Sequence, residues 1–569
     1  MKISGARVVV ECLIEQGVHT VFGYPGGTIL NIYDELYQCS DRIRHILTAH
    51  EQGAAHAADG FARSTGSVGV VMATSGPGAT NLVTGIATAY MDSVPLVAIT
   101  CNVGTPLLGK DSFQEVDIAG ITMPITKHNY IVRDPKKLAA TIREAFLIAK
   151  SGRPGPVLID IPKDVTAAVI DYAPAEPAAA TKESIAAQKA SLRRIVKTAE
   201  PTDDDIRAAA DLINAAERPL IYCGGGVVIS GAEKELLDMA HKAQIPVCVT
   251  LMGKSAFPTA DALCTGMVGM HGTKASNLAV GKCDLLIAVG ARFSDRVTSD
   301  TKRFAKNSKV LHIDIDPAEI DKNVKTSASV IGNIKETLAR LVGMVEKKDT
   351  GKWHEQIAEW KQLVPPSWTS AKNMHPRVIC EYVHEKLGDD AIITTEVGQH
   401  QMWVAQFYPF AKPRTFITSG GLGTMGFGTG AAIGAQVANP GAYVVHFAGD
   451  GSFRMNCNEL ATINHYNLPV IIIVLNNGTL GMVRQWQNLF YGQRYSQTTL
   501  DFGPDFVKLA EAYAIRGYRA KDESEFKAVF DDAIRERRSA LIECRIDLDE
   551  MVLPMVPGGK PVDDPIMEV

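Results

Sequence analysis

The chain alternates short runs of apolar, mostly β-branched residues with longer segments in which apolar residues recur at helical spacing. Apolar runs that end in Gly, Asp, Asn or Thr are typical of parallel strands buried on both faces. We predict strands at Val68–Ala73, Pro95–Thr100, Val157–Ile161, Leu220–Cys223, Pro246–Thr250, Leu285–Val289, Val310–Ile315, Ala391–Thr395, Tyr443–Ala448, Val470–Leu475 and Leu541–Arg545. Their alternation with helices predicts repeated βαβ units, and therefore an α/β fold of doubly wound parallel sheets.

Two segments interrupt this rhythm. Ala173–Pro201 is rich in Ala, Pro, Lys and Glu without a strand signal, which predicts an interdomain linker. Lys347–Asn373 is charged and contains three tryptophans, so we expect it to wrap over a neighbouring surface. These breaks predict α/β domains at 1–170, 200–345 and 370–548, followed by a C-terminal arm at 549–569.

Composition narrows the class of protein. Of the 569 residues, 46% are hydrophobic and 21% charged, which excludes a disordered, collagenous or small disulfide-stapled protein. The net charge is only -5 and no basic run occurs, so we expect neither a nucleic-acid nor a membrane partner. The longest apolar run, Leu468–Leu475, is too short to span a bilayer. Ten scattered cysteines without a CxxC pair and the lack of a signal-peptide pattern predict a cytoplasmic enzyme with reduced thiols.

The strongest local signal is a pair of polar strand ends. One predicted strand ends at Gly449-Asp450-Gly451, and the next one along the chain ends at Asn476-Asn477. In a βαβ unit both ends lie at the carboxyl edge of the sheet, where α/β proteins bind ligands. Carboxylate and amide oxygens suit Mg²⁺, and glycines let backbone amides approach an anion. Each piece alone is a common turn or strand end, but together they predict a site for a diphosphate and a metal.

This pattern resembles that of the thiamine-diphosphate enzymes. Further motifs resemble the catalytic subunits of the biosynthetic acetolactate synthase (acetohydroxyacid synthase) family over almost the whole chain: Phe22–Gly27, Ala49–His56, Thr74–Asn81, Phe113–Glu115, Ser151–Pro156, Gly420–Gly426, Gly481–Trp486 and Val552–Pro557. The resemblance implies three doubly wound parallel-sheet domains, which bind in turn the pyrimidine ring, FAD and the diphosphate.

The resemblance also implies roles for particular residues. It makes Asp450, Asn477 and the Thr479 carbonyl the Mg²⁺ ligands, and Glu51 the partner of the aminopyrimidine ring. Met425 would hold the cofactor in a bent shape that brings its reacting atoms together. Other residues implied to contact thiamine diphosphate are Val397, Gly398, Gln399, His400, Gly423, Gly449, Gly451, Ser452, Gly481 and Met482. Glu51 opens a helix of small residues, so we expect it to be partly buried.

An FAD site is implied in the middle domain. The residues implied to form it are Arg153, Gly224, Gly225, Met270, His271, Gly272, Arg292, Asp295, Asp314 and Asp316. On their own, the glycines that follow the strand Leu220–Cys223 are a weak sign of a dinucleotide site. Two positions depart from the family pattern: Ser294 replaces a common Asp, and Thr28 replaces a common Ala.

The implied reaction joins two 2-ketoacids. Pyruvate is decarboxylated and condensed with pyruvate or 2-ketobutyrate, giving 2-acetolactate or 2-aceto-2-hydroxybutyrate for branched-chain amino-acid biosynthesis. Gln114, Lys163 and the Gly27 amide would line the substrate approach, and Trp486 would favour the larger acceptor. The family resemblance also implies a homodimer or tetramer with active sites between subunits, and a small regulatory subunit.

Other functions compete with this hypothesis. A catabolic, FAD-independent acetolactate synthase is the nearest alternative, followed by pyruvate oxidase and glyoxylate carboligase. Glu51 argues against glyoxylate carboligase, which has an apolar residue at this position. A catalytically silent subunit of the same fold would not need Glu51, Gln114, Asp450 and Asn477 together. His50-Glu51 and His56 do not have the spacing of a zinc-protease helix.

Overall fold

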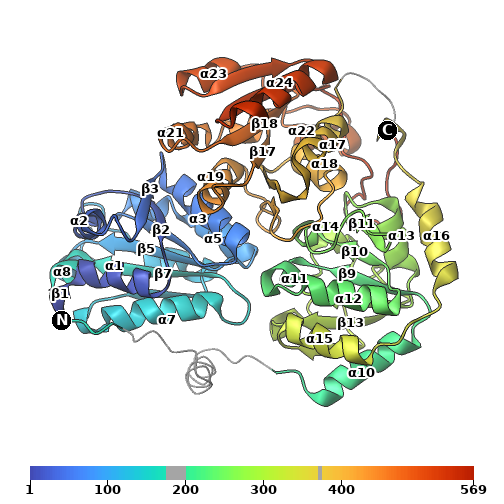
Figure 1. Ribbon diagram of the computed structural model, residues 1–569, viewed down its shortest axis with the longest axis horizontal. Helices are drawn as coiled ribbons and strands as arrows, with labels where there is room; N and C mark the ends of the chain where they lie inside the picture. The colour runs from blue at the N-terminus through green and yellow to red at the C-terminus, as the bar shows by residue number, and fades with distance from the viewer. Residues whose placement is uncertain (175–199, 369–373) are drawn as a thin grey trace.

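The computed structural model describes residues 1–174, 200–368 and 374–569. They form three units, each built on a six-stranded parallel sheet flanked by helices (Figure 1). Most of the predicted linker Ala173–Pro201 lies outside the described residues, as do residues 369–373. Within the described ranges, no helix combines the length and apolar character needed to cross a membrane.

The first unit contains the sheet β3-β2-β4-β5-β7-β6. Its strands are β2 (Thr20–Tyr24), β3 (Arg44–Leu47), β4 (Gly69–Ala73), β5 (Leu96–Asn102), β6 (His128–Ile131) and β7 (Pro156–Pro162). Its helices are α1 (Gly5–Glu15), α2 (Leu30–Gln38), α3 (Glu51–Thr65), α4 (Pro77–Thr80), α5 (Val83–Met91), α6 (Ile118–Thr122), α7 (Leu138–Lys150) and α8 (Lys163–Ala167). A separate antiparallel pair, β1 (Lys2–Ser4) and β8 (Val169–Asp171), ties the N-terminus to the end of this unit.

The middle unit contains the sheet β11-β10-β9-β12-β13-β14. Its strands are β9 (Pro219–Cys223), β10 (Val247–Val249), β11 (Cys264–Met267), β12 (Leu285–Val289), β13 (Lys309–Asp314) and β14 (Ala328–Ile331). Its helices are α10 (Asp203–Ala215), α11 (Gly225–Ser230), α12 (Glu233–Ala243), α13 (Lys274–Lys282), α14 (Asp295–Thr298) and α15 (Ile334–Met344). Numbered along the chain, this is the order 3-2-1-4-5-6 of dinucleotide-binding folds.

The third unit contains the sheet β16-β15-β17-β18-β20-β19. Its strands are β15 (Ile392–Thr395), β16 (Phe416–Ile417), β17 (Val444–Gly449), β18 (Val470–Asn476), β19 (Arg516–Ala520) and β20 (Ala540–Arg545). Its helices are α17 (Pro376–Leu387), α18 (Gln399–Phe407), α19 (Gly428–Ala438), α20 (Asp450–Phe453), α21 (Leu460–His465), α22 (Gly481–Phe490), α23 (Phe506–Ala512) and α24 (Glu523–Glu536). The first and third units share one strand order, 2-1-3-4-6-5 along the chain.

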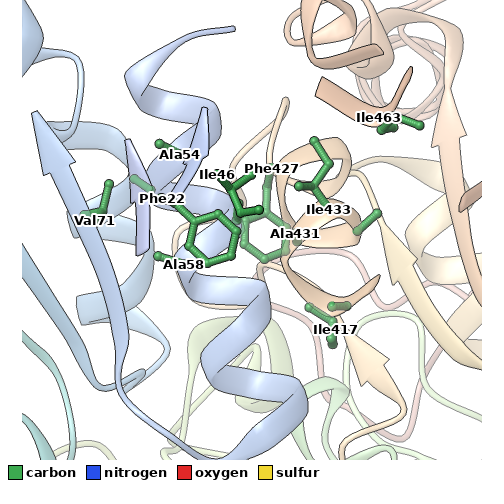
Figure 2. Close-up of a cluster of buried hydrophobic side chains, with 14 of the residues drawn as sticks. Phe22, Ile46, Ala54, Ala58, Val71, Ile417, Phe427, Ala431, Ile433 and Ile463 are labelled. Carbon is green, nitrogen blue, oxygen red and sulfur yellow. The ribbon is translucent and has the colours of Figure 1, made fainter. Parts of the chain in front are cut away.

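The first and third units meet through two equivalent helices, α3 and α19. Their backbones come so close that a Cβ at Gly434 would overlap the carbonyl oxygen of Ala57. One buried cluster therefore runs from the first sheet into the third and includes Phe22, Ile46, Phe427 and Ile433 (Figure 2). Small residues on both helices allow this approach, because larger ones would hold the axes apart.

Two further segments cover the middle unit. Helix α16 (Gly351–Lys361) packs against α13, and Trp353 Nε1 donates to the Pro219 carbonyl oxygen (3.1 Å). The C-terminal tail runs from the third unit onto the middle one, where Val556 N donates to Met270 O (2.8 Å). Lys274 Nζ on α13 donates to the Asp563 carbonyl oxygen farther along the tail.

The predicted fold class is confirmed, and each predicted strand overlaps an observed one. The prediction missed every edge strand of the three sheets, namely β3, β6, β11, β14, β16 and β19. Edge strands are exposed on one side, so they lack the continuous apolar runs that identify central strands.

Candidate functional site

Polar residues gather at the carboxyl edge of the third sheet. The segment 397–400 follows β15, Asp450 follows β17 and Asn477 follows β18, and these strands are neighbours in that order. The chain turns in opposite directions from β15 and β17 to reach β16 and β18, which makes this edge a topological switch point. Such points leave a crevice in which α/β sheets bind ligands.

Asp450 is a buried carboxylate, only 4% exposed. Desolvation raises its pKa to about 7, against the effect of backbone hydrogen bonds that include the amides of Gly451 and Gly478. Among the described residues it forms no ion pair with a lysine or arginine side chain, so a bound cation would offset the cost of burying its charge.

The neighbouring oxygen donors suit a hard cation. Thr479 is buried and its hydroxyl donates to the Thr498 carbonyl oxygen (2.7 Å), while its N–H donates to Asn477 Oδ1 (3.3 Å). No described residues form a group of three or more His, Cys, Asp and Glu side chains suited to a metal. The carboxyl edge of the third sheet instead offers one carboxylate, one carboxamide and one backbone carbonyl, which are the oxygen donors that Mg²⁺ prefers.

The glycines of the third unit allow close approach of side chains. A Cβ at Gly481 would overlap Gln399 Oε1 and lie 2.7 Å from Asn477 Nδ2. A Cβ at Gly449 would lie 2.7 Å from His400 Nδ1. The structure therefore brings Gln399, His400, Gly449, Asn477 and Gly481 into one cluster.

Glu396 is a site residue that the sequence reasoning did not assign. It is fully buried and accepts hydrogen bonds from Gly426 N (2.6 Å), Gly428 N (3.0 Å) and Ser452 Oγ (2.7 Å). Burial raises its pKa to about 7, although these hydrogen bonds oppose the shift. Glu396 thus joins the loop that carries Met425 to the segment after Asp450. A charged residue directly after a buried strand was the signal that could have identified it.

Four predicted residues meet at the carboxyl edge of the first sheet. Lys163 Nζ donates to the Gly27 carbonyl oxygen (3.2 Å). Glu51 is 9% exposed, and its Oε2 accepts from Asn81 Nδ2 (3.0 Å). Gln114 follows β5, and its carbonyl oxygen would lie 2.8 Å from a Cβ at Gly76.

Thr28, which departs from the family pattern, completes this edge. Its hydroxyl donates to the Cys101 carbonyl oxygen (2.9 Å) and accepts from Ser75 N (3.1 Å). The hydroxyl thus joins the loops after β2 and β4 to the end of β5, a role that an alanine could not fill.

A cavity of about 1110 Å³ lies where the middle unit meets the other two. Of the residues that the family resemblance assigns to FAD, it is lined by Arg153, Gly224, Gly225, Met270, His271, Arg292, Asp295 and Asp314. The third unit contributes Val397, Gly398, Gly423, Met482 and Trp486. Asp316 and Gly272 are not among the described residues that line the cavity. Asp316 contacts one that does, because its carboxylate forms an ion pair with the Arg153 guanidinium (3.3 Å).

The cavity opens at the switch point of the middle sheet, between β9 and β12. The glycine run 224–226 follows β9, and Ala291 and Arg292 follow β12. Trp486 projects from α22 onto the same cavity, with the Arg296 guanidinium 5.4 Å from its ring.

Within the described part of this chain, the candidate residues of the two sheet edges are not bonded directly to each other. Among the described residues, no hydrogen bond or ion pair joins Glu51, Gln114 or Lys163 to Asp450 or Asn477. Met425 is half-buried on the loop between β16 and α19.

Comparison with known proteins identifies the class. Three thiamine pyrophosphate enzyme families match the chain: the N-terminal TPP binding domain at residues 3–121, the central domain at 206–341 and the C-terminal TPP binding domain at 396–544. The chain therefore belongs to the thiamine pyrophosphate (thiamine diphosphate) enzymes, and each matched family falls within one of the three units.

Full-length relatives narrow this membership to the acetolactate synthase large subunits. A probable acetolactate synthase large subunit of Methanocaldococcus jannaschii is 51% identical over 567 residues, covering 98% of this chain and 94% of the relative. Acetolactate synthase large subunits of Parasynechococcus marenigrum (48%, covering 98% and 90%) and Pyropia yezoensis (46%, covering 98% and 94%) are also similar. The family resemblance inferred from the motifs is confirmed.

Proposed function

We propose that this protein is a biosynthetic acetolactate synthase, a transferase that uses thiamine diphosphate, Mg²⁺ and FAD. It converts pyruvate to 2-acetolactate, and pyruvate with 2-ketobutyrate to 2-aceto-2-hydroxybutyrate. One observation carries the proposal: two sheets of identical strand order present complementary groups at the same edge. The first offers a buried glutamate, and the third a buried carboxylate beside a carboxamide. The names of the full-length relatives support the same activity.

The third unit fits a metal and a diphosphate. Asp450 and Asn477 would hold Mg²⁺ by side-chain oxygens and Thr479 by its carbonyl, because buried Asp450 lacks another cationic partner among the described residues. Gly451 and Ser452 lie in the short helix α20, which begins at Asp450, and their backbone amides suit the diphosphate. When bound, thiamine diphosphate supplies the electron sink through which a 2-ketoacid loses CO₂ and passes its remaining two-carbon unit to a second 2-ketoacid.

Glu51 is the proposed acid–base group. Asn81 occupies its Oε2, while Oε1 faces Gly78, where a Cβ would lie 3.2 Å away. Oε1 can therefore accept a hydrogen bond from the aminopyrimidine ring and exchange a proton with it. The glycine at 78 keeps that side open.

The substrate would approach over the first-unit edge. The exposed ammonium of Lys163 beside Gly27 can attract a 2-ketoacid carboxylate, and Gln114 adds a neutral donor. Trp486 would contact the extra methyl group of 2-ketobutyrate, a preference of about 1–3 kcal/mol. Met425, on the loop held by Glu396, would support the cofactor from below.

The middle unit is proposed to bind FAD in its cavity. The strand order, the glycine run after β9 and the volume of about 1110 Å³ suit a dinucleotide. We accordingly assign pyrimidine binding to residues 1–170, FAD binding to 200–345 and diphosphate binding to 370–548. This cavity favours the biosynthetic form over a flavin-free catabolic one.

Assembly should complete the active site. Because the first-unit and third-unit sets do not meet among the described residues of one chain, we propose that each pairs with the complementary set of a second subunit in a homodimer or tetramer. By analogy with relatives named large subunits, a small regulatory subunit would bind in addition. We place the enzyme in the cytoplasm.

A competition assay tests the function. Purified protein receives equal pyruvate and 2-ketobutyrate with thiamine diphosphate and Mg²⁺, with and without FAD, and mass spectrometry quantifies both acetohydroxyacids. We expect both products, with acetohydroxybutyrate in excess, and loss of both without FAD. Acetolactate alone, independent of FAD, would indicate the catabolic form. Acetaldehyde or acetyl phosphate without either product would overturn the assignment.

A further inference from the structure

A chain of amide side chains leads from the proposed metal ligand Asn477 to the C-terminal tail. Asn477 Nδ2 donates to Gln399 Oε1 (3.2 Å). Gln399 Nε2 donates to Gln485 Oε1 (3.0 Å) and to the Glu550 carbonyl oxygen (2.9 Å). Gln485 Oε1 also accepts from Val552 N (2.9 Å), and its Nε2 donates to Val552 O (3.0 Å).

The backbone at the tail end fixes the direction of the whole chain. A backbone N–H can only donate and a carbonyl can only accept, so Val552 allows one orientation of the Gln485 amide. From Gln399, the Gln485 oxygen can then accept a hydrogen bond only from the amide nitrogen. The same nitrogen donates to the carbonyl oxygen of Glu550. The Gln399 oxygen is left facing Asn477, which must present its nitrogen to Gln399 and turn Oδ1 the other way, where the longer hydrogen bond from Thr479 N (3.3 Å) supports the same orientation. Mg²⁺ binds that oxygen and not the nitrogen.

Burial makes this orientation costly to reverse. Gln399 is 4% and Gln485 2% exposed, and Val552 is fully buried. A reversed amide at either glutamine would therefore leave buried donors facing donors and buried acceptors facing acceptors. A side chain at Gly481 would occupy the space where Gln399 and Asn477 meet.

The tail is in turn held by the middle unit. We name Glu550–Val556 the C-terminal strap. Val556 N donates to Met270 O (2.8 Å), and Trp368 Nε1 donates to Leu553 O (3.1 Å). The strap therefore connects the wall of the middle-unit cavity with the third-unit edge.

We propose that the C-terminal strap sets the metal-binding orientation of Asn477 through Gln485 and Gln399, so that strap seating and Mg²⁺ binding are coupled. Gln485 is a positioning residue that touches neither metal nor substrate. The inference rests on the proposed function, because it takes Asn477 as a Mg²⁺ ligand. Coupling of this kind is reciprocal: whatever the seated strap adds to Mg²⁺ affinity, bound Mg²⁺ adds to strap seating.

The test compares two glutamines that contact the strap. Gln485 belongs to the amide chain, whereas Gln406 Nε2 donates to Leu553 O (3.2 Å) outside it. The readout is the Mg²⁺ dissociation constant of the full-length protein with saturating thiamine diphosphate, followed by tryptophan fluorescence, with FAD content measured separately. We expect Gln485→Ala to weaken Mg²⁺ binding about 10-fold and Gln406→Ala to leave it unchanged. Gln485→Met, which preserves side-chain volume, should repeat the loss if the alanine variant does not fold.

Hydrogen exchange gives the reciprocal readout. Mg²⁺ with thiamine diphosphate should slow exchange of the Val552 amide in the wild type, and much less in Gln485→Met. Unchanged Mg²⁺ affinity in the Gln485 variants would overturn the inference while leaving the proposed function standing. So would equal losses in the Gln485 and Gln406 variants, which would indicate general loosening of the strap. A wild type that binds no Mg²⁺ with thiamine diphosphate would overturn both.

Discussion

The first and third units share one strand order yet present different chemistry at the same edge. At the first-unit edge, hydrogen bonds such as those of Thr28 join neighbouring strand ends and loops, the Lys163 ammonium is exposed and the Glu51 carboxylate is buried. The third-unit edge buries Asp450 and Glu396 and extends its hydrogen bonds as far as the C-terminal strap.

This difference suits one scaffold to the two tasks of the proposed function. A topological switch point supplies the crevice in both units, because strand order fixes where loops diverge. Under the proposed function, the side chains on those loops decide whether the crevice handles a proton or holds an anion with its metal. The predictions below test this division, from the largest expected effect to the smallest.

Replacing Glu51 should affect the chemistry and not the binding of the metal. Glu51→Gln keeps the size of the side chain and its ability to form hydrogen bonds, but removes the carboxylate that accepts a proton. We therefore expect kcat to fall about 10²–10⁴-fold. The Mg²⁺ affinity of Glu51→Gln should stay near that of the wild type. In the control Asp34→Asn, which changes an exposed carboxylate, both kcat and Mg²⁺ affinity should be unchanged. Steady-state kinetics and Mg²⁺ titration check this. Nearly full activity in Glu51→Gln would remove the proton-handling role from the first unit.

Disrupting the α3–α19 contact between the first and third units should destabilise the protein. A Cβ in Gly434→Ala would overlap the Ala57 carbonyl oxygen, and backbone cannot yield as a flexible side chain does. We expect the free energy of unfolding to fall by about 3 kcal/mol, measured by urea denaturation. At Gly441 a Cβ would meet nothing within 4 Å, so Gly441→Ala is the matched control. Equal stability of the two variants would contradict the close packing.

Replacing Asp450 should weaken metal binding, the property that Glu51→Gln leaves unchanged. Asp450→Ala removes the only charged ligand of the proposed site, so we expect Mg²⁺ affinity to fall about 100-fold or more. FAD content should not change, because Asp450 does not line the middle-unit cavity among the described residues. Calorimetric Mg²⁺ titration and flavin absorbance measure the two effects. Unaltered Mg²⁺ affinity would place the metal elsewhere.

The contact between the units should also weaken in acid. His56 on α3 is buried against Phe427 of the third unit, and desolvation lowers its pKa to about 3 from 6.5. The unfolded chain therefore takes up a proton below pH 6.5 that the folded protein does not. Stability is then lost as pH falls from 6.5 towards 3, by up to about 1.4 kcal/mol per pH unit for this group.

The variant His56→Gln isolates this contribution. Its free energy of unfolding should decline less steeply between pH 6.5 and 5 than that of the wild type, as measured by urea denaturation at each pH. The exposed His19→Gln variant should keep the wild-type slope. Parallel curves for His56→Gln and the wild type would show that folding does not lower the pKa of His56.

The sequence predicted the centre of each sheet better than its edges. Strands such as Val470–Asn476 are buried along their whole length, and their apolar runs are visible without a structure. Arg44–Leu47 and Arg516–Ala520 are edge strands in which only one position each is fully buried, so their patterns resemble those of loops. Thr20–Tyr24 is the exception: it lies inside its sheet but contains a glycine and ends in an exposed tyrosine.

Candidate residues were recognisable where a local motif carried them. Asp450 and Asn477 each follow an apolar strand, and Gly224–Gly226 follow another. Gln485 and Glu550 offered no such signal, because their partners are distant in sequence and a glutamine on a helix is usually solvated. Glu396 does follow a buried strand, but its role depends on hydrogen-bond donors that are distant in sequence, in the segment 426–429 and at Ser452.

Sequence alone determined the α/β class, the central strands and the residues at their carboxyl ends, because burial on both faces and strand-end turns are written in consecutive residues. Tertiary structure decided which of those ends face one another, how α3 and α19 come into backbone contact, and which way the Asn477 amide points. These depend on groups tens to hundreds of residues apart. Only folding brings a backbone donor such as Val552 N to the one acceptor that satisfies it.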